Sequence, residues 1–492
     1  MAPKELGNRL APLQPGQVID GFLLEVRSHQ GGMAALWRVT KVGSNDPLPL
    51  IMKVPRIMGG DDPTTIVGFE VEQMILPALS GVHVPRFIAK GDFTQQPYIV
   101  MERVAGDSLK PRFDAAPLAI DEVVLIGAKV ATALHDLHRQ HVIHLDVKPS
   151  NIMFRPDDGS AGAGAAVLID FGLSRHDHLP DLLEEEFELP MGTGPYMSPE
   201  QVLFVRNDPR SDLFALGVML YHLTTGERPF GAPTSVRGLR TRLYRDPVPP
   251  RALRPDCPPW LQELILSCLE VQPGQRPQSG AQLAFDLQHA DQVVLTERAE
   301  RSARRGGMQA ARRWFAAMGA EPAADASAVA QTARSQILMA AVDVSGADAT
   351  LLTNVRSTVL RLLHTEPGTR LACVAVMKTN RIGMDDLRDA DGSSKHVNLL
   401  VQLKHWARPV LQALAPGEPD GRVTFHVLEA PDPAGAIIEF GRKNHVDHIV
   451  MGARGSGGLR RHLGSVSAKV SAEADCTVTV VRSAARASDG AS

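Results

Sequence analysis

Residues 144–151 read His-Leu-Asp-Val-Lys-Pro-Ser-Asn, and residues 170–172 read Asp-Phe-Gly directly after the apolar run Ala166–Ile169. Two carboxylates, a lysine and an amide therefore flank one short strand. Before this stretch the chain has short β-like runs, and after it the patterns are helical. This order predicts a strand-rich lobe followed by a helical lobe, an α+β body. The β-like runs are Gly21–Arg27, Ala35–Val42, Leu48–Val54 and Pro97–Val104.

The stretch resembles the catalytic core of the eukaryotic-like protein kinases, most closely their bacterial Ser/Thr branch, which implies the bilobal protein kinase fold. Phosphoryl transfer needs an acceptor oxygen held in line and metal ions that neutralise the triphosphate. By resemblance, Asp146 would orient the substrate hydroxyl and accept its proton, and Lys148 would stabilise the transferring phosphoryl group. Asn151 and Asp170 would bind Mg²⁺ or Mn²⁺, with ATP as the phosphoryl donor.

The rest of the kinase pattern follows in the expected order within residues 17–289. By resemblance, Lys53 would hold the α- and β-phosphates of ATP. Glu72 would be its partner on a helix, with Glu70 as the second choice. Residues 97–104 resemble the hinge that binds adenine. Its contacts would be the side chain of Met101 and the backbone of Glu102 and Val104.

Residues 192–200, Gly-Thr-Gly-Pro-Tyr-Met-Ser-Pro-Glu, resemble the substrate-docking loop that ends the kinase activation segment. Arg276 is placed to pair with Glu200, and Asp212 matches the buried helix that follows. We interpret these three residues and His144 as structural. The Pro-Glu segment argues against small-molecule kinases of similar fold, because those lack it.

The loop that would cover the phosphates departs from the family pattern. Residues 29–36 read His-Gln-Gly-Gly-Met-Ala-Ala-Leu. His29 stands at the first glycine position of the family and Ala34 at the third, whereas Gly31 and Gly32 remain and would contact the nucleotide. A side chain at the first position is costly only if that residue needs a positive φ. We therefore expect altered nucleotide affinity with activity retained.

A second departure concerns regulation. Leu145 replaces the arginine that in many relatives pairs with a phosphate on the activation loop, and Arg175–Gly192 contains no Ser, Thr or Tyr. The hypothesis is a non-RD kinase that is not activated by phosphorylation of this stretch. The acidic residues of this stretch either favour basic substrates or simply belong to a loop exposed to solvent. The acidic residues are Asp177, Asp181, Glu184, Glu185, Glu186 and Glu188.

Length and composition are those of an ordinary globular protein. The 492 residues suggest about three domains, and 44% hydrophobic with 22% charged residues exclude a disordered or fibrous chain. A net charge of −3 gives no reason to expect a nucleic-acid partner. The four cysteines have no paired spacing and are expected to be reduced, mostly buried thiols. No signal peptide or membrane-spanning stretch is visible, so we expect a cytoplasmic protein.

Residues 290–334 are rich in Ala and Arg and are predicted to be a partly helical linker, and residues 483–492 a flexible tail. On a helix the arginines would share much of one face, which a membrane surface or an acidic partner could bind. The apolar face is short, so we favour a soluble, charged connector. The arginines are Arg298, Arg301, Arg304, Arg305, Arg312 and Arg313.

Residues 335–482 alternate strand candidates with helical segments, which predicts an α/β domain with a parallel sheet and crossover helices. The predicted strands are Ile337–Asp343, Arg370–Met377, Val423–Leu428, His448–Gly452 and Thr477–Val481.

Residues 339–345, 450–455 and 463–467 resemble the motifs of the universal stress protein family. A glycine-rich turn between a strand and a helix exposes N–H groups that suit a phosphate. By resemblance to ATP-binding members, the nucleotide contacts would be Asp343, Gly452, Gly455, Gly464 and Ser465. Residues 456–463 make the loop one shorter than the usual nine, so a turn that binds nothing is an equal alternative. The family pairs through its last strand, which makes a homodimer an expectation.

These features predict an ATP-dependent Ser/Thr protein kinase that acts on protein substrates. The universal-stress-like domain would be its nucleotide sensor, dimerisation module or regulator. The alternative is a pseudokinase scaffold that holds nucleotide without turnover, although a scaffold has no chemical need for a base and metal ligands. In a third hypothesis the stress-like domain is the main effector and the kinase only tunes it.

Overall fold

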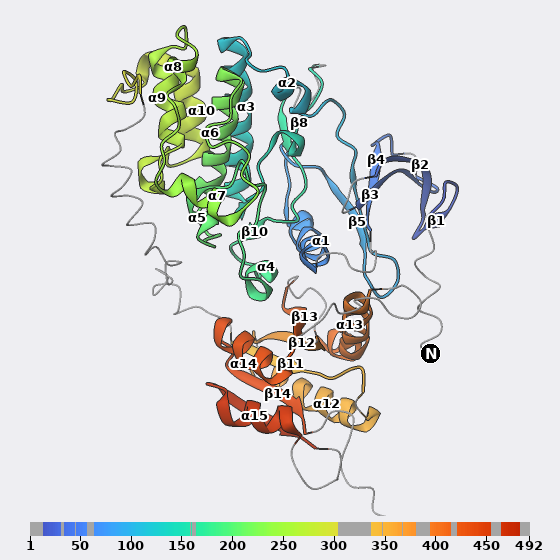
Figure 1. The fold of residues 1–492 in the computed structure, drawn as a ribbon. Helices are drawn as coiled ribbons and strands as arrows, with labels where there is room; N and C mark the ends of the chain where they lie inside the picture. The colour runs from blue at the N-terminus through green and yellow to red at the C-terminus, as the bar shows by residue number, and fades with distance from the viewer. Residues whose placement is uncertain are drawn as a thin grey trace, which may run out of the picture.

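The computed structural model describes residues 13–30, 34–44, 46–56, 63–157, 159, 164–303, 336–346, 348–366, 368–379, 394–414, 421–453 and 464–482. They form a strand-rich lobe, a helical lobe and a second domain built on a parallel sheet (Figure 1). The α+β body followed by an α/β domain is thus the architecture that the sequence predicts.

The strand-rich lobe is a six-stranded antiparallel sheet in the order β1-β2-β3-β4-β6-β5. Side chains alternate between its faces, so Trp37, Met52 and Tyr98 meet in a buried core on one side. On the other side, Ile99 joins the cluster that contains helix α1 (Pro63–Ile75). The strands are β1 (Val18–Ile19), β2 (Phe22–Gln30), β3 (Ala34–Lys41), β4 (Leu50–Pro55), β5 (Phe87–Gly91) and β6 (Tyr98–Glu102).

The helical lobe is organised around helix α3 (Ile120–Arg139). Acidic residues in the first turn and basic residues in the last turn of α3 complement the helix dipole. Apolar residues at intervals of three and four bury one face of this helix. The other helices are α2 (Lys110–Asp114), α5 (Pro199–Val202), α6 (Arg210–Thr225), α7 (Val236–Leu239), α8 (Pro250–Leu253), α9 (Pro259–Cys268) and α10 (Gly280–Gln288).

Two short two-stranded antiparallel sheets and one short helix follow α3 in the chain. Strand β7 pairs with β10, and β8 pairs with β9. The elements are β7 (Val142–Ile143), the 3-10 turn η3 (Pro149–Asn151), β8 (Ile152–Phe154), β9 (Ala166–Leu168), β10 (Arg175–His176) and α4 (Leu182–Glu186).

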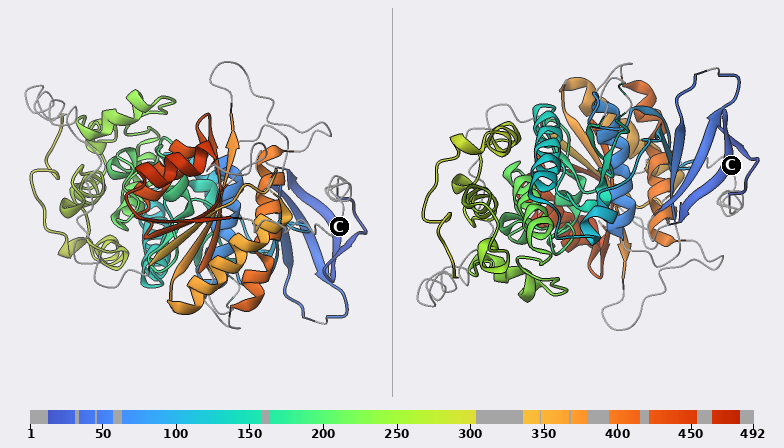
Figure 2. Two further views of the ribbon diagram at one scale, coloured as in Figure 1. Left: turned by 90° about the horizontal axis from the view of Figure 1, so that it is seen from below. Right: turned by 90° about the horizontal axis from the view of Figure 1, so that it is seen from above.

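The second domain is a five-stranded parallel sheet in the order β13-β12-β11-β14-β15. Helices α12 and α13 cover one face, and α14 and α15 cover the other (Figure 2). The elements are β11 (Ile337–Ala341), α12 (Ala349–Thr365), β12 (Arg370–Lys378), α13 (Lys395–Ala413), β13 (Val423–Ala430), α14 (Pro433–Lys443), β14 (His448–Gly452), α15 (Ser465–Glu473) and β15 (Thr477–Val481).

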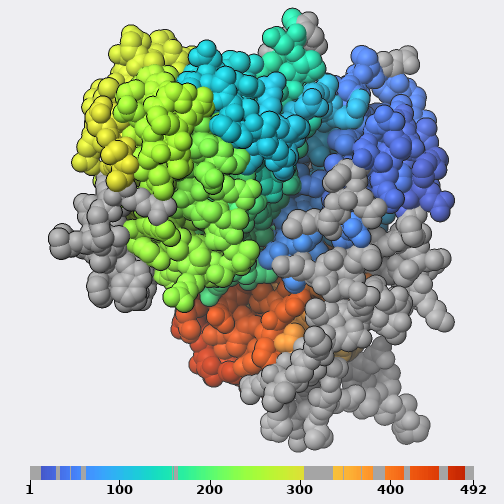
Figure 3. Space-filling model, turned by 45° about the horizontal axis from the view of Figure 1, so that its top comes forward, coloured from blue at the N-terminus to red at the C-terminus, as the bar shows by residue number. Residues whose placement is uncertain are grey.

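The second domain packs directly against the first. Helix α13 lies next to α1, and β13 and α14 lie next to α4 (Figure 1), and the surfaces of the two domains meet in Figure 3. Val397, Leu400 and Val401 on α13 belong to the same buried cluster as the apolar residues of α1 and α4. The contact is therefore a shared apolar core as well as a polar surface.

The cysteines, the absence of a membrane-spanning stretch and the linker were also predicted from the sequence. Cys257, Cys268 and Cys373 are buried free thiols and Cys476 is partly exposed, as the sequence predicts. Among the residues that are described, no helix is both long and apolar enough to span a bilayer. Of the predicted linker, 290–303 is described and contains one 3-10 turn, Ala290–Gln292. Residues 304–335 and the tail lie outside the description.

Candidate active site

Lys53 on β4 reaches two carboxylates that come from different parts of the chain. Its Nζ lies 2.5 Å from Oε2 of Glu72 on α1 and 2.8 Å from Oδ1 of Asp170, just after β9. Strand alternation sends Met52 into the sheet core and Lys53 to the opposite face, toward α1. The predicted partner Glu72 is thus in place. Glu70 does not share its face, because helix residues two positions apart point in different directions.

These three groups shift one another's pKa. Burial alone would lower the pKa of Lys53, but the charges of Asp170 and Glu72 outweigh burial and raise it. Lys53 lowers the pKa of Asp170 to about 2, against the opposing effect of burial. At neutral pH, Lys53 is therefore a cation and Asp170 an anion. The Asp170 side chain is 44% exposed, so it can accept a further ligand.

Asp146 lies in the loop after β7, where its two oxygens have different partners. Oδ1 accepts hydrogen bonds from the N–H of Thr193 at 2.9 Å and from its hydroxyl at 2.6 Å. Oδ2 accepts one from Nζ of Lys148 at 2.6 Å. The same ammonium donates to Oγ1 of Thr193 at 3.2 Å. The structure therefore brings Asp146 and Lys148 together and adds Thr193 from the docking loop.

Asn151 and Asp170 lie at the same end of the β8–β9 hairpin. Asn151 directly precedes β8, and its carbonyl accepts a hydrogen bond from the N–H of Ile169 at 3.0 Å. Nδ2 of Asn151 donates to the backbone carbonyl of Asp146 at 3.1 Å. The hairpin thus brings the backbone at Asn151 next to Ile169, the residue before Asp170, and the Asn151 side chain to the loop that carries Asp146.

Asp212, at the start of α6, holds the loop that carries Asp146. Its carboxylate accepts hydrogen bonds from the backbone N–H groups of His144 and Leu145, both at 2.9 Å, and lies 2.9 Å from Nε2 of His138. Leu145 has a φ of 61°, in the left-handed region that a leucine adopts only when its surroundings hold it there. Asp212 supplies two of those contacts and so positions Asp146.

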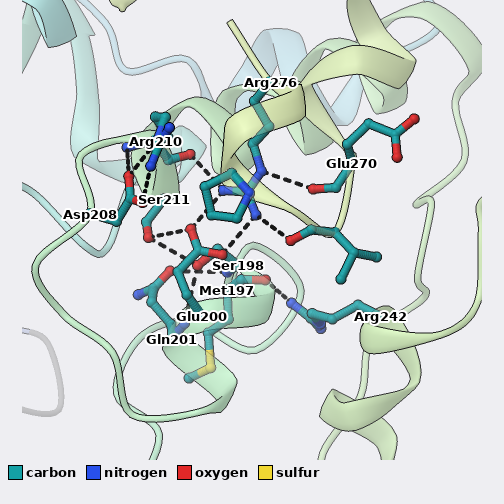
Figure 4. Close-up of polar contacts among 12 residues, drawn as sticks. Met197, Ser198, Glu200, Gln201, Asp208, Arg210, Ser211, Arg242, Glu270 and Arg276 are labelled. Atoms are coloured by element: carbon teal, nitrogen blue, oxygen red, sulfur yellow. Dashed lines mark hydrogen bonds and ion pairs between the residues drawn. The ribbon is translucent and has the colours of Figure 1, made fainter. Parts of the chain in front are cut away.

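The end of the docking loop is tied into the helical lobe by a buried ion pair (Figure 4). The guanidinium of Arg276 donates to both oxygens of Glu200, at 2.6 and 2.7 Å. Ser198 caps α5 through the backbone of Gln201, and Ser211 donates to Glu200 at 2.7 Å. This network connects the segment after Thr193 to the centre of the lobe.

The hinge residues lie at the end of β6. The N–H of Glu102 donates to the carbonyl of Arg86 at 2.8 Å, and its carboxylate pairs with Arg155. Any bond from Glu102 to adenine must therefore use its carbonyl oxygen. Met101 is partly exposed and Val104 is buried, at the join between the lobes. Gly31 and Gly32, which would cover the phosphates, lie outside the described residues.

In the second domain, the predicted nucleotide contacts gather at the carboxyl ends of β11 and β14. These strands are neighbours in the sheet, with Asp343 just after β11 and Gly452 closing β14. A Cβ on Gly452 would lie 2.9 Å from a methyl of Leu351 on α12, so packing against this buried leucine is reason enough for a glycine here. Gly464 caps α15, which begins at Ser465, and Gly455 lies outside the described residues.

The contacts between the acidic stretch of the kinase and the second domain were not predicted from the sequence. The sequence analysis interpreted this stretch as a substrate determinant or a solvated loop. In the structure, Glu185 and Glu186 on α4 are 12% and 3% exposed and bind Arg370 and His426 of the second domain. The solvated interpretation therefore fails for these two glutamates. Isolated charges in distant segments have no periodic pattern that predicts such pairing.

Comparisons with known proteins agree with this geometry. Residues 67–289 match the family described as "Protein kinase domain", and residues 322–482 match the "Universal stress protein family". The chain is 34% identical over 281 residues to the serine/threonine-protein kinase pkn3 of Myxococcus xanthus, covering 55% of this chain and 50% of that protein. It is 28% identical over 295 residues to PknL of Mycobacterium tuberculosis, covering 60% and 71%.

The crystal structure of the Mycobacterium tuberculosis PknI kinase domain aligns with 56% of this chain and 99% of its own length, at 24% identity and a TM-score of 0.43. The chain spans about half the length of pkn3. The two regions matched by the family models lie in the two bodies seen in the fold. The chain therefore joins a protein kinase domain, similar to those of bacterial Ser/Thr kinases, to a C-terminal universal stress protein domain.

Proposed function

We propose that the protein is an ATP-dependent Ser/Thr kinase that transfers the γ-phosphate of Mg-ATP to protein hydroxyls. The observation that carries the proposal is the simultaneous assembly of two groups of side chains. Lys53 is paired with Glu72 and Asp170, and Asp146 is paired with Lys148 and Thr193. A nucleotide-binding scaffold needs the first group at most, so the second group favours an enzyme over the scaffold.

The donor set fits a nucleotide with a divalent metal. Asp170 and Asn151 each offer a hard side-chain oxygen, and Mg²⁺ in proteins is held by one or two carboxylates and other oxygen donors together with phosphate oxygens and water. Mn²⁺ accepts the same donors. Bound Mg-ATP supplies the electrophilic phosphorus and the charge neutralisation of the phosphates. Lys53 would hold the α- and β-phosphates, fixed by its pairing with Glu72.

Asp146 and Lys148 would act on the acceptor. Oδ1 of Asp146 is held by two hydrogen bonds from Thr193, so its orientation is set before a substrate arrives. The carboxylate would orient the serine or threonine hydroxyl and receive its proton at Oδ2. Lys148, already 2.6 Å from Oδ2, would stabilise negative charge on the transferring group.

The kinase domain begins, in this proposal, at residue 17, because strands β1 to β4 are part of the sheet that carries Lys53. We also assign it to the non-RD type. Leu145 is buried and apolar where an arginine would receive a phosphate, and Arg175–Gly192 has no hydroxyl to phosphorylate. The adenine would contact Met101 and the backbone of Glu102 and Val104.

The second domain offers a surface for a second copy of the chain. Strand β15 is an edge strand paired only with β14, and none of its residues is fully buried. Edge strands have free backbone groups that can pair with another chain. We propose a homodimer through this strand. Sedimentation equilibrium should give twice the mass of one chain. Val480→Pro should give one chain mass, because the backbone N–H of Val480 points away from β14, toward the free edge.

The test of the enzyme is transfer of labelled γ-phosphate to a basic protein substrate by the full chain. Asp146→Asn and Asp170→Ala should each lower kcat by roughly a thousandfold, because each removes a group that acts on the reacting atoms. Asp475→Asn changes an exposed carboxylate and serves as the matched control. A wild-type chain that binds ATP without transfer would establish the scaffold instead.

A further inference from the structure

The second domain contacts the two elements of the kinase that carry or flank its catalytic groups. Lys404 on α13 lies 2.5 Å from Oε1 of Glu70 on α1. Both side chains are nearly buried, and the ammonium also lies over the rings of Phe93 and Phe425. Glu70 is two residues from Glu72, the partner of Lys53. The second domain therefore holds the same helix that orients the predicted phosphate-binding lysine.

The second contact is with α4, between Asp170 and the docking loop. The guanidinium of Arg370 on β12 donates to both oxygens of Glu185, at 2.5 and 2.6 Å. His426 on β13 is fully buried, with Nδ1 2.8 Å from Glu186 and Nε2 3.3 Å from Glu185. A bidentate pair fixes direction as well as distance. The short helix is thus held by residues of another domain.

Within the kinase, α4 packs against α1 through the buried Leu182 and Leu183, and its polar contacts lie at the start of the segment. Asp181 caps α4 through the N–H of Glu184 and pairs with Arg206 at 2.7 Å. A five-residue helix is too short to be stable by itself in water. Beyond Asp181, the polar contacts described for Glu185 and Glu186 are with the second domain.

Backbone geometry shows that the two domains fit closely here. Gly421, just before β13, has a φ of 93°, and a Cβ on it would lie 2.7 Å from Cδ of Pro180 and 3.4 Å from Sδ of Met74. Pro180 directly precedes the cap of α4, and Met74 is on α1. One turn of the second domain thus touches both elements, which makes the contact specific in shape as well as in charge.

We infer that Arg370, His426 and Lys404 are positioning residues for phosphoryl transfer, which the universal stress domain contributes to the kinase. They hold α1 and α4 in the arrangement in which the Lys53 and Asp146 groups are assembled. This inference rests on the proposed kinase function and states how the second domain controls it.

The test exchanges charges in the full chain. Arg370→Glu and Glu185→Arg should each lower kcat for phosphoryl transfer at least roughly tenfold, because each leaves like charges facing each other in a nearly buried contact. The loss should fall on kcat more than on KM for ATP, since the hinge is not touched. Carrying both changes in one chain should restore kcat to within about threefold of wild type.

Arg442→Glu is the matched control, because Arg442 forms an exposed ion pair with Asp475 on the same domain. Its kcat should equal that of wild type. Lys404→Glu and Glu70→Lys form a second exchange pair at α1, with the same expected loss and recovery. This pair decides the question if the Arg370 variant does not fold. A single variant with unchanged or higher kcat would overturn the inference, and a higher value would make the contact inhibitory.

Hydrogen exchange separates this inference from the proposed function. In the single variants, peptides from Pro63–Ile75 and Leu182–Glu186 should exchange faster than in wild type, and in the double variant they should return to the wild-type rate. If the wild-type chain transfers no phosphate, the proposed function fails. Hydrogen exchange then still tests the contact between the domains. Equal exchange rates in all variants would refute the positioning role, and faster exchange in the single variants alone would support it.

Discussion

Arg276→Met removes one half of the buried ion pair that anchors the docking loop (Figure 4). Arg276 is fully buried and Glu200 is 9% exposed. The substitution keeps a long apolar side chain but deletes both hydrogen bonds to Glu200. It also deletes those from the guanidinium to the carbonyls of Glu270, Arg210 and Val271. Glu200 keeps only the bond from the hydroxyl of Ser211 among the contacts described for its carboxylate.

The expected cost follows from this environment. Removing one partner of a buried ion pair costs about 3–5 kcal/mol, since the remaining charge is buried without compensation. This corresponds to roughly a hundredfold to several thousandfold in the unfolding equilibrium. Arg276→Lys keeps the charge but loses the bidentate hydrogen bonding to Glu200, so its cost should lie between those of wild type and Arg276→Met. Glu200→Leu combined with Arg276→Met removes both charges and should cost less than Arg276→Met alone.

The assay is urea unfolding of the full chain, read by hydrogen exchange in peptides from α5 and α9 so that the helical lobe is followed by itself. Lys110→Met is the control in the same lobe. Lys110 forms an exposed pair with Asp114, and its loss should change the free energy of unfolding by less than about 0.5 kcal/mol. A cost below about 1 kcal/mol for Arg276→Met, or a double variant less stable than Arg276→Met, would refute the reasoning.

Two further outcomes are expected. Thr193→Val deletes the hydroxyl that donates to Asp146 and accepts from Lys148, so kcat should fall about tenfold to hundredfold. Thr193→Ser keeps the hydroxyl and should keep most of the wild-type kcat. An unchanged kcat for the valine variant would contradict the role of this hydroxyl. With a thiol reagent at pH 8, the native chain should show one slowly reacting cysteine, the partly exposed Cys476, whose pKa is raised by burial, and four after denaturation. Its rate should rise about tenfold per pH unit below that pKa, because only the thiolate reacts. More than one reactive thiol in the native chain would contradict the burial of the others. Burial raises the pKa of the other thiols, to about 11 for Cys257, to about 12 for Cys268, and further for Cys373.

Much of the fold could be predicted because its elements have periodic patterns. The predicted strand Arg370–Met377 and the observed strand Arg370–Lys378 differ by one residue, and Thr477–Val481 is the same in both. Strand β5, Phe87–Gly91, was missed because five residues between a proline and a loop give little pattern. Helix α4 was missed for a different reason, since its stability comes from contacts with other elements and not from its own sequence.

The candidate site shows the same division. The kinase resemblance was enough to predict Glu72, and not Glu70, as the partner of Lys53. Helix geometry explains why only Glu72 reaches Lys53, because residues two positions apart on a helix point to different neighbours. The partner of Glu70 could not be predicted. Lys404 is a single charge far along the chain, and Arg370 lies 185 residues from Glu185. Pairing of this kind depends on how two finished domains meet, which no local pattern records.

The bond between Glu186 and His426 joins residues that are 240 positions apart in the chain. Ribosomes add about 5–20 residues per second, so His426 is made on the order of tens of seconds after Glu186. During that interval the kinase lobes already possess Lys53, Asp146 and Asp170 but lack the residues of the second domain that align α1 and α4. A growing chain therefore reaches the aligned state only after the second domain has been made and has folded.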